Sequence, residues 1–466
     1  MHSASQEKLI ESAKSLKSSK KIFEPLNTPV MDVELSPADH HEEDDLFSTF
    51  RGFLILGRIL GVVPISGVFK KSYKDLYFSR RSFAAISSYI CVVLLAFNAS
   101  LGVAAAVRDQ KRNALEIARA IGTPIYALWG LFIYTYFLLR GEEFMKIFKF
   151  WASCNLYYSK KDTYLYRIIV IISVIVFTSA VLENATIHME YFEAFDDING
   201  HIVRYGKETG NAPIHKMYYW RSHAVWNNAV GYHPIFLVIA ILTHKWVLYG
   251  WNYIDVFMAL FCRALYYKFK VLCKAAEDTL FQFLPLPLES PDAYIPSEFD
   301  RQAWLQVTRD HEQLCNLIDV MNRFFSPLLF VSYTVNIYYV CMQLLGALNP
   351  EFVAHSLVHS IYAPWSFVHI ILRVFLLSIC AAKINEYAHN IRNVVQRCPV
   401  ELYDGRIAKL DKRVNAGPKL GFSGLGCFVV TKPFMLSILN VVFTIEIVLL
   451  QGLSTSQPSN TNCPKP

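Results

Sequence analysis

Twelve aromatic, amide, carboxylate and imidazole side chains lie at similar depth along five apolar segments of the chain. Aromatic rings beside hydrogen-bonding groups suit a ligand that combines an apolar face with several hydrogen-bonding groups. A single Tyr or Trp is equally typical of the aromatic belt of a membrane protein, but polar groups inside a membrane are expensive and usually functional. The candidates are Tyr126, Trp129, Glu183, His188, Trp226, Asn227, Tyr232, Tyr338, Gln343, Tyr362, Trp365 and His369.

A second set of side chains recurs at helical spacing near the C-terminus. At 100° per residue, one helix face carries Asn440, Thr444, Ile447, Val448 and Gln451. Such a face either lines a pore, with an apolar constriction below an amide collar, or packs on neighbouring helices. The spacing alone does not choose between these alternatives. Glu446 points about 140° away from Gln451 and is expected to face other helices.

The segments that carry these residues are long and apolar. Hydrophobic residues make up 53% of the 466 residues, and they gather in blocks of about 20, the length at which a helix crosses a bilayer. The expected fold class is therefore all-α, a polytopic membrane protein with seven transmembrane helices. The spans run near 82–107, 121–139, 168–182, 226–246, 325–348, 361–381 and 427–450.

The distribution of Lys and Arg predicts the orientation. The N-terminal tail and the segments after spans two, four and six hold 33 of them, and the opposite segments hold 9. Basic residues stay on the cytosolic side, so the N-terminus is expected in the cytosol and the C-terminus outside. This is the reverse of a G-protein-coupled receptor.

The other segments are too polar or too charged to span. Residues 52–69 contain Arg58, and a charge at mid-bilayer costs several kcal/mol, so a helix on the cytosolic membrane surface is expected there. A later helical pattern either packs on its own chain or contacts another subunit; it consists of Trp304, Val307, Leu314, Ile318 and Met321. The expected organisation is a disordered cytosolic tail (1–46), a membrane-surface helix and linker (47–81), helices one to four (82–248), a cytosolic helical hairpin (249–322), helices five and six (323–382), a cytosolic linker (383–426), helix seven (427–451) and an extracellular tail (452–466).

The sequence offers little support for catalysis. We find no nucleophile–base set, phosphate-binding glycine loop or metal-ligand spacing, so neither an enzyme nor a bound cofactor or metal is expected. Of the ten cysteines, only Cys463 is clearly expected outside, which argues against a disulfide framework. The basic residues flank the spans, so they do not indicate binding of nucleic acid.

Several short blocks occur in a colinear series: LGVVPISGV (60–68), GWNYIDVFMALFCRALYYKF (250–269), TVNIYYVCMQLL (334–345), CAAKINEY (380–387) and TIEIVLLQ (444–451). Together they resemble the sugar-receptor group of the insect gustatory receptor family. The last block resembles the family signature Thr-Tyr, five mostly apolar positions, Gln-Phe, although Ile445 stands for Tyr and Gly452 for Phe. Leu450 is a candidate to replace the bulk of that Phe.

This resemblance implies a sugar-gated, non-selective channel for Na⁺, K⁺ and Ca²⁺ in the plasma membrane of gustatory neurons. It implies a homotetramer, or a heterotetramer with related receptors, in which the seventh helices line the pore. Each subunit would hold a mono- or disaccharide, and extensions of helices four to seven would form a cytosolic anchor. The signature assigns Gln451 to the pore. A metabotropic, G-protein-coupled seven-helix chemoreceptor is the alternative, and the sequence does not name the sugar.

Overall fold

A computed structural model of the chain describes residues 46–108, 117–118, 120–154, 156–158, 160, 162–196, 214–283, 297–348 and 357–455. All of them belong to one compact unit, Asp44–Pro466. The expected disordered tail, apart from its last residue, and most of the expected extracellular tail lie outside the described residues. The described part is almost entirely helical, which confirms the all-α fold class.

Within the described residues, six helices are long and apolar enough to cross a membrane, and a further apolar helix, α15, follows them. These seven are α3 (Phe83–Arg108), α5 (Gly122–Leu139), α7 (Leu165–Asp196), α11 (Pro234–Phe283), α12 (Glu298–Leu348), α13 (Leu357–Val395) and α15 (Lys432–Thr455). The shorter helices are α2 (Leu46–Ile59), α6 (Gly141–Ser153), α9 (Ile214–Ser222), α10 (Ala224–Val230) and α14 (Gly405–Ala416), with single 3₁₀ turns at η2 (Tyr73–Asp75) and η4 (Val400–Leu402).

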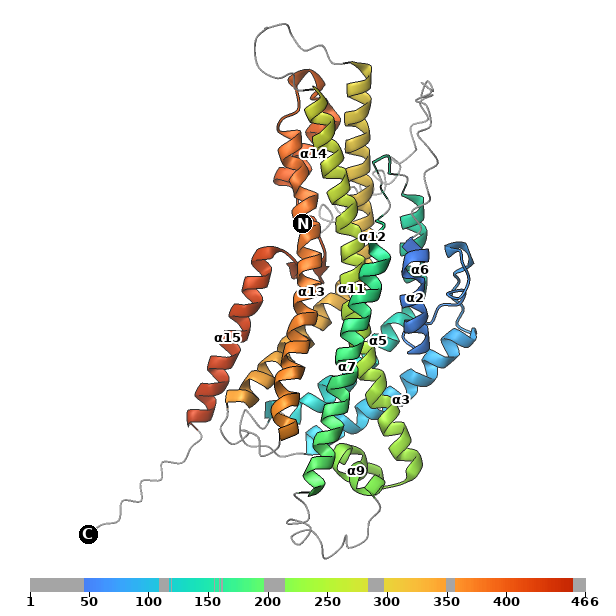
Figure 1. Cartoon of the computed structure of the whole chain (residues 1–466), viewed down its shortest axis with the longest axis vertical. Coiled ribbons are helices and arrows are strands. Elements are labelled where there is room, and N and C mark those ends of the chain that lie inside the picture. The colour runs from blue at the N-terminus through green and yellow to red at the C-terminus, as the bar shows by residue number, and fades with distance from the viewer. Residues whose placement is uncertain are drawn as a thin grey trace, which may run out of the picture. The chain divides into compact units, whose positions relative to one another are not determined.

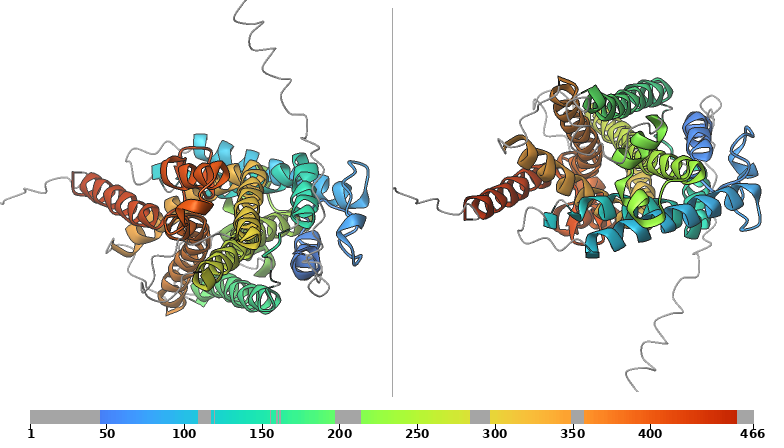
Figure 2. Two further views of the ribbon diagram at one scale, coloured as in Figure 1. Left: turned by 90° about the horizontal axis from the view of Figure 1, so that it is seen from above. Right: turned by 90° about the horizontal axis from the view of Figure 1, so that it is seen from below.

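Helix α11 is the central element of this unit. It packs most extensively on α13 and also contacts α3, α5, α7 and α12. Helices α11 to α13 run between α14 at one end and α9 at the other (Figure 1), which we call the α14 end and the α9 end. Helix α15 stands apart from the other helices in both end-on views (Figure 2), and its main contacts are with α12 and α13.

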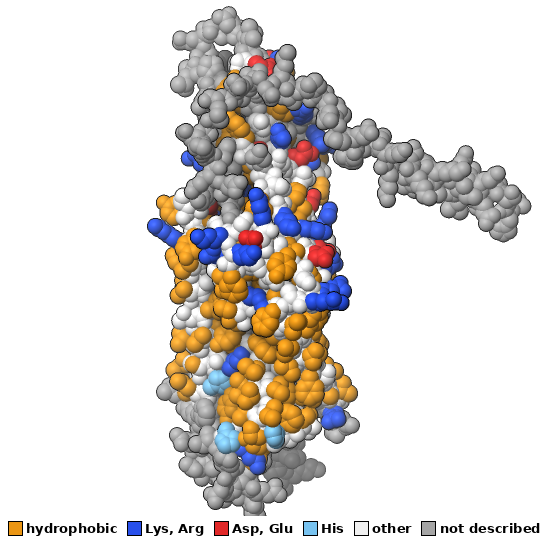
Figure 3. Space-filling view, turned by 90° about the vertical axis from the view of Figure 1, so that its right-hand side faces the viewer, with side chains coloured by type: hydrophobic (Ala, Val, Ile, Leu, Met, Phe, Trp, Pro, Cys, Tyr) orange, Lys and Arg blue, Asp and Glu red, His pale blue; other side chains and the backbone are white. Residues whose placement is uncertain are grey.

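The surface of this unit is divided into zones. Hydrophobic side chains cover much of the half toward the α9 end, and Lys and Arg gather beyond them toward the α14 end (Figure 3). A contiguous apolar surface of this kind is unusual for a soluble protein and fits contact with lipid. The basic zone lies at the end that the charge distribution predicts to be cytosolic.

Helix α2 packs on the bundle through aromatic rings. Tyr253, Phe257 and Phe261 recur at every fourth residue and therefore share one face of α11. The ring of Phe50 lies 4.6 Å from that of Phe261, and the ring of Phe53 lies 4.6 Å from that of Tyr253. The structure lays the apolar face of α2 on α11, and the expected position of this helix at the membrane surface stays a prediction.

The fourth span begins later than the sequence predicts. Gly231 follows α10 with a φ of 71°, a conformation that favours glycine. Pro234 then begins α11, at a position where the missing N–H of proline breaks no hydrogen bond. The expected span 226–246 is therefore split between two helices. Residues 249–255, which the sequence assigns to the cytosolic hairpin, continue α11, and Trp251 to Asp255 are buried.

The long extensions of α11 and α12 agree with the sequence. Helix α11 runs unbroken to Phe283, and α12 begins at Glu298. The five side chains of the later helical pattern are all buried: Trp304, Val307, Leu314, Ile318 and Met321. Their burial shows that this segment packs on its own chain.

A two-stranded hairpin precedes α15, where β1 (Ser423–Gly424) pairs antiparallel with β2 (Phe428–Val429). Asn322 of α12 donates a hydrogen bond to the carbonyl oxygen of Gly421 (2.9 Å) and accepts one from the amide of Ser423 (3.1 Å). The hairpin therefore fixes the start of α15 against α12. It occupies the residues where the sequence begins the seventh span.

Candidate functional site

A cavity of about 570 Å³ lies toward the α9 end of the bundle, within the range of about 300–1,000 Å³ that small-molecule sites occupy. Its walls come from α3, α5, α7, α9, α10, α11, α12 and α13 and from His223, which joins α9 to α10. It is lined by Asn98, Gly122, Thr123, Tyr126, Ala127, Glu183, Asn184, Ile187, Arg221, Ser222, His223, Ala224, Val225, Trp226, Ala240, His244, Leu248, Trp251, Tyr338, Tyr339, Met342, Gln343, Tyr362, Ser366 and Ile370.

Half of the residues predicted from the sequence lie on this wall: Tyr126, Glu183, Trp226, Tyr338, Gln343 and Tyr362. The phenol of Tyr126 donates to the carbonyl oxygen of His244 (3.0 Å), and the indole of Trp226 donates to Asn98 Oδ1 (2.7 Å). The bundle itself thus holds these rings in place, and five helices that are distant in sequence meet at one site.

The other predicted residues do not line the cavity: Trp129, His188, Asn227, Tyr232, Trp365 and His369. Trp129 is buried in the core and stacks on Phe132, and Trp365 is 42% exposed on α13. The rotation of each helix decides whether a side chain reaches the cavity. His188 lies nearby, where its Nδ1 accepts from or donates to the Tyr218 hydroxyl (2.8 Å).

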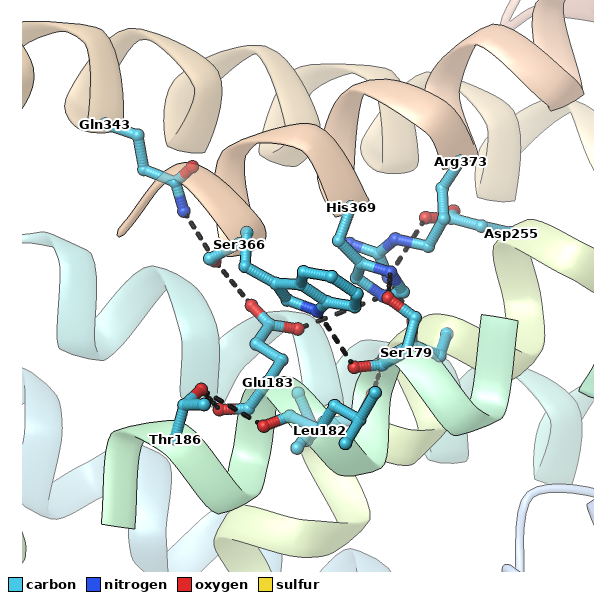
Figure 4. A network of polar contacts seen from close by, with 12 residues as sticks. Ser179, Leu182, Glu183, Thr186, Asp255, Gln343, Ser366, His369 and Arg373 are labelled. Carbon is cyan, nitrogen blue, oxygen red and sulfur yellow. Dashed lines mark hydrogen bonds and ion pairs between the residues drawn. The ribbon is translucent and has the colours of Figure 1, made fainter. Parts of the chain in front are cut away.

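Glu183 belongs to a polar network on the cavity wall (Figure 4). The amide of Gln343 donates to the hydroxyl of Ser366 (2.8 Å), which in turn donates to the Glu183 carboxylate. The second carboxylate oxygen lies 3.9 Å from His369 Nε2. One carboxylate therefore joins α7 to α12 and α13 beside the cavity.

A buried ion pair lies deeper in the bundle. Arg373 Nη1 is 3.6 Å from Asp255 Oδ2, and both side chains are almost fully buried. Arg373 also donates to Asn252 Oδ1 (3.0 Å) and lies over the ring of Trp251, 4.7 Å from its centroid. The hydroxyl of Ser332 donates to Asp255 Oδ1 (2.6 Å). Because Trp251 also lines the cavity, this ion pair supports its wall from behind.

Helical spacing is the signal that finds several of the wall residues missed by sequence reasoning. Ser366 and Ile370 follow the predicted Tyr362 at intervals of four residues, so the three share one face of α13. Trp251 was missed for a different reason, since the late start of α11 moves it from the expected cytosolic segment to the cavity.

Two buried polar atoms of wall residues, His223 Nε2 and Gln343 Oε1, have no hydrogen-bond partner among the described residues. Burial, together with the nearby charge of Lys245, lowers the pKa of His223 to about 4, so this imidazole is neutral at pH 7. A buried polar atom without a partner costs about 1–3 kcal/mol. A ligand hydroxyl on this wall would remove that cost.

Helix α15 contacts the bundle along one edge. Phe434, Ile438 and Val442 recur at every fourth residue and pack inward, and the Phe434 ring stacks 4.4 Å from that of Phe428. The predicted pore residues whose side chains are described all lie exposed on the remaining surface: Asn440, Thr444, Ile447, Val448 and Gln451. The side chains of Leu450 and Glu446 lie outside the described residues.

The fold and the cavity define a helical membrane protein with a cavity of small-molecule size at one end of its bundle. Residues 11–463 match the model of the trehalose receptor family, and the chain belongs to that family. It is 20% identical over 413 residues to gustatory receptor 5a for trehalose of Drosophila melanogaster, which covers 85% of this chain and 83% of the relative. It is 25% identical over 201 residues to the Drosophila gustatory receptor for sugar taste 64f, which covers 43% of this chain and 39% of the relative. These homologues confirm the resemblance that the sequence blocks indicate.

The fold is also that of a solved receptor. The structure of the insect olfactory receptor OR5 from Machilis hrabei superposes with a TM-score of 0.59 at 14% identity and covers 86% of this chain and 97% of that chain.

Proposed function

We propose that the chain is a gustatory receptor that works as a sugar-gated, non-selective cation channel. The observation that carries this proposal is the cavity, which combines aromatic rings with buried hydrogen-bonding atoms. His223 Nε2 and Gln343 Oε1 have no partner among the described residues, and the rings of Tyr126, Trp226 and Trp251 lie on the same wall. Rings stack on the apolar face of a sugar, and the open polar atoms bind its hydroxyls. The ligand is a mono- or disaccharide, in keeping with relatives named for trehalose and for sugar taste.

The exposed face of α15 supports a pore between subunits. Asn440, Thr444 and Gln451 are exposed on a helix whose opposite edge packs on the bundle. Amide groups facing lipid are costly, so this face fits copies of α15 around a water-filled pathway rather than hydrocarbon. We infer a tetramer, formed by this chain alone or with related receptors, in which Ile447 and Val448 form the constriction below a Gln451 collar.

The cavity and α15 share a packing contact. Ile370 lines the cavity and also packs in one buried cluster with Val442 of α15 and Val340 of α12. A sugar that moves the wall at Ile370 therefore acts directly on the packed edge of α15. This contact is the route by which we expect binding to open the pore.

Recording currents tests this proposal. The chain is expressed in cells whose G-protein signalling is blocked, and a panel of mono- and disaccharides is applied to excised outside-out patches. We expect sugar-evoked cation current without soluble cytosolic factors. A response that appears only in intact cells with active G proteins would support the metabotropic alternative. Tags at both termini test orientation in the same cells, with the C-terminal tag accessible from outside and the N-terminal tag not accessible.

A further inference from the structure

A basic groove of about 260 Å³ lies between α12 and α14, at the α14 end and away from the cavity. It is lined by Leu305, Thr308, Arg309, Glu312, Arg406, Lys409, Leu410 and Arg413. Four of these side chains are cations and one is a carboxylate, so the groove carries a clear positive excess.

The sequence of α14 explains why the cations converge. Its buried residues Ile407, Leu410 and Val414 hold one face of the helix against the bundle. Arg406, Lys409 and Arg413 recur at spacings of three and four residues on a neighbouring face. That face meets Arg309 and Glu312 of α12. The position of the apolar face thus forces three cations of α14 toward a fourth on α12.

The single carboxylate does not balance these charges. Glu312 Oε1 is shared between Lys409 Nζ (3.2 Å) and Arg413 Nη2 (3.4 Å). Neither Arg309 nor Arg406 has an ion-pair partner in the part of the chain that the structure describes, and both are exposed. Two guanidinium groups are therefore available to an external anion, and their planar donor sets match phosphate oxygens.

We propose that this groove binds a soluble anion that carries phosphate groups. Arg309 precedes the apolar part of α12, which starts near Phe325, by about 24 Å of helical rise. A lipid headgroup at the membrane surface does not reach that far, so the anion comes from solution. Bound there, it would join α12 to α14, which is followed along the chain by the hairpin and α15.

Purified full-length receptor in detergent tests the binding without any current. Tripolyphosphate is titrated at constant ionic strength while thermal unfolding and affinity are measured, with sulfate as the comparison anion. The test variant is Arg309→Gln with Arg406→Gln, which removes neither of the Glu312 ion pairs. The control is Lys146→Gln with Lys149→Gln, which makes the same charge change in another groove, between α6 and α12.

We expect tripolyphosphate to stabilise the native chain and the control variant, and to bind the test variant at least tenfold more weakly. Glu312→Gln removes the one repelling charge and should bind several-fold more tightly. Equal binding by the test variant, or no response of the native chain to millimolar tripolyphosphate, overturns the proposal. Binding only to phosphatidylcholine vesicles that contain phosphatidylinositol bisphosphate, through the same arginines, would overturn the assignment to a soluble anion.

Discussion

The buried ion pair behind the cavity gives a quantitative prediction. Asp255→Asn leaves the Arg373 guanidinium, which is 3% exposed, without its carboxylate partner. Breaking such a pair by removing one member costs about 3–5 kcal/mol. An unfolding entropy of about 2.1 cal/mol/K per residue corresponds to about 1 kcal/mol/K for 466 residues. The melting temperature should therefore fall by about 3–5 °C.

The assay is thermal unfolding of the detergent-purified receptor, followed by size-exclusion chromatography after heating. Asp75→Asn is the matched control, because it breaks the exposed pair with Lys70, whose side chains are 65% and 42% exposed. Such a pair contributes at most about 1 kcal/mol, so the control should shift by about 1 °C or less. The double variant Asp255→Asn/Arg373→Gln carries no unpaired charge and should lose less than the two single changes together. A single Asp255→Asn variant as stable as the control would refute this reasoning.

Three further predictions concern the cavity. Glu183→Ala should raise the sugar concentration for half-activation about fivefold to a hundredfold, as expected for a lost hydrogen bond worth about 1–3 kcal/mol. Trp365→Ala, off the cavity wall, should leave this concentration unchanged. Equal effects of the two substitutions would contradict the placement of the two residues. Residues Asn184-Ala185-Thr186 form a sequon for N-glycosylation. Because the side-chain oxygen of Asn184 accepts a hydrogen bond from Lys245, we expect this sequon to stay unmodified, and a glycosidase-sensitive mobility shift lost in Asn184→Gln would disprove this. Because the pKa of His223 is lowered to about 4, the sugar concentration for half-activation should be constant from pH 6 to 8 and should rise only as the pH falls toward 4. A transition near pH 6.5 that disappears in His223→Gln would mean that the imidazole is not held neutral.

Much of the fold follows from simple patterns in the sequence. Apolar length alone predicts the long helices, because a bilayer or a bundle core requires it. The spacing of Trp304 and Met321 likewise predicts the buried face of α12. The main error is the start of the fourth span, because Gly231 and Pro234 divide an apolar stretch that hydropathy treats as continuous.

The wrong start of the fourth span explains why Trp251 and Asp255 were not predicted near the site. Once α11 starts at Pro234, Trp251 and Asp255 lie inside the bundle, where Asp255 pairs with Arg373. The rotation of each helix about its axis is a second feature that the sequence does not determine. It places Tyr362 on the cavity and leaves Trp365 exposed, because three residues turn a helix by about 300°, so the two side chains point about 60° apart. Such rotations depend on packing between helices and cannot be predicted from one segment.

The central claim, that α15 lines a pore, is tested most directly by measuring which face of α15 is accessible in a conducting receptor. Cysteine is introduced singly at positions 447, 448 and 451 and, as a control on the packed edge, at Val442, which is 6% exposed. A thiol reagent is applied outside while sugar-evoked current is recorded. We expect block at 451, block at 447 or 448 only while sugar holds the channel open, and no block at 442. Block at 442 with none at the other three positions would show that α15 does not line the pore through the face assigned here.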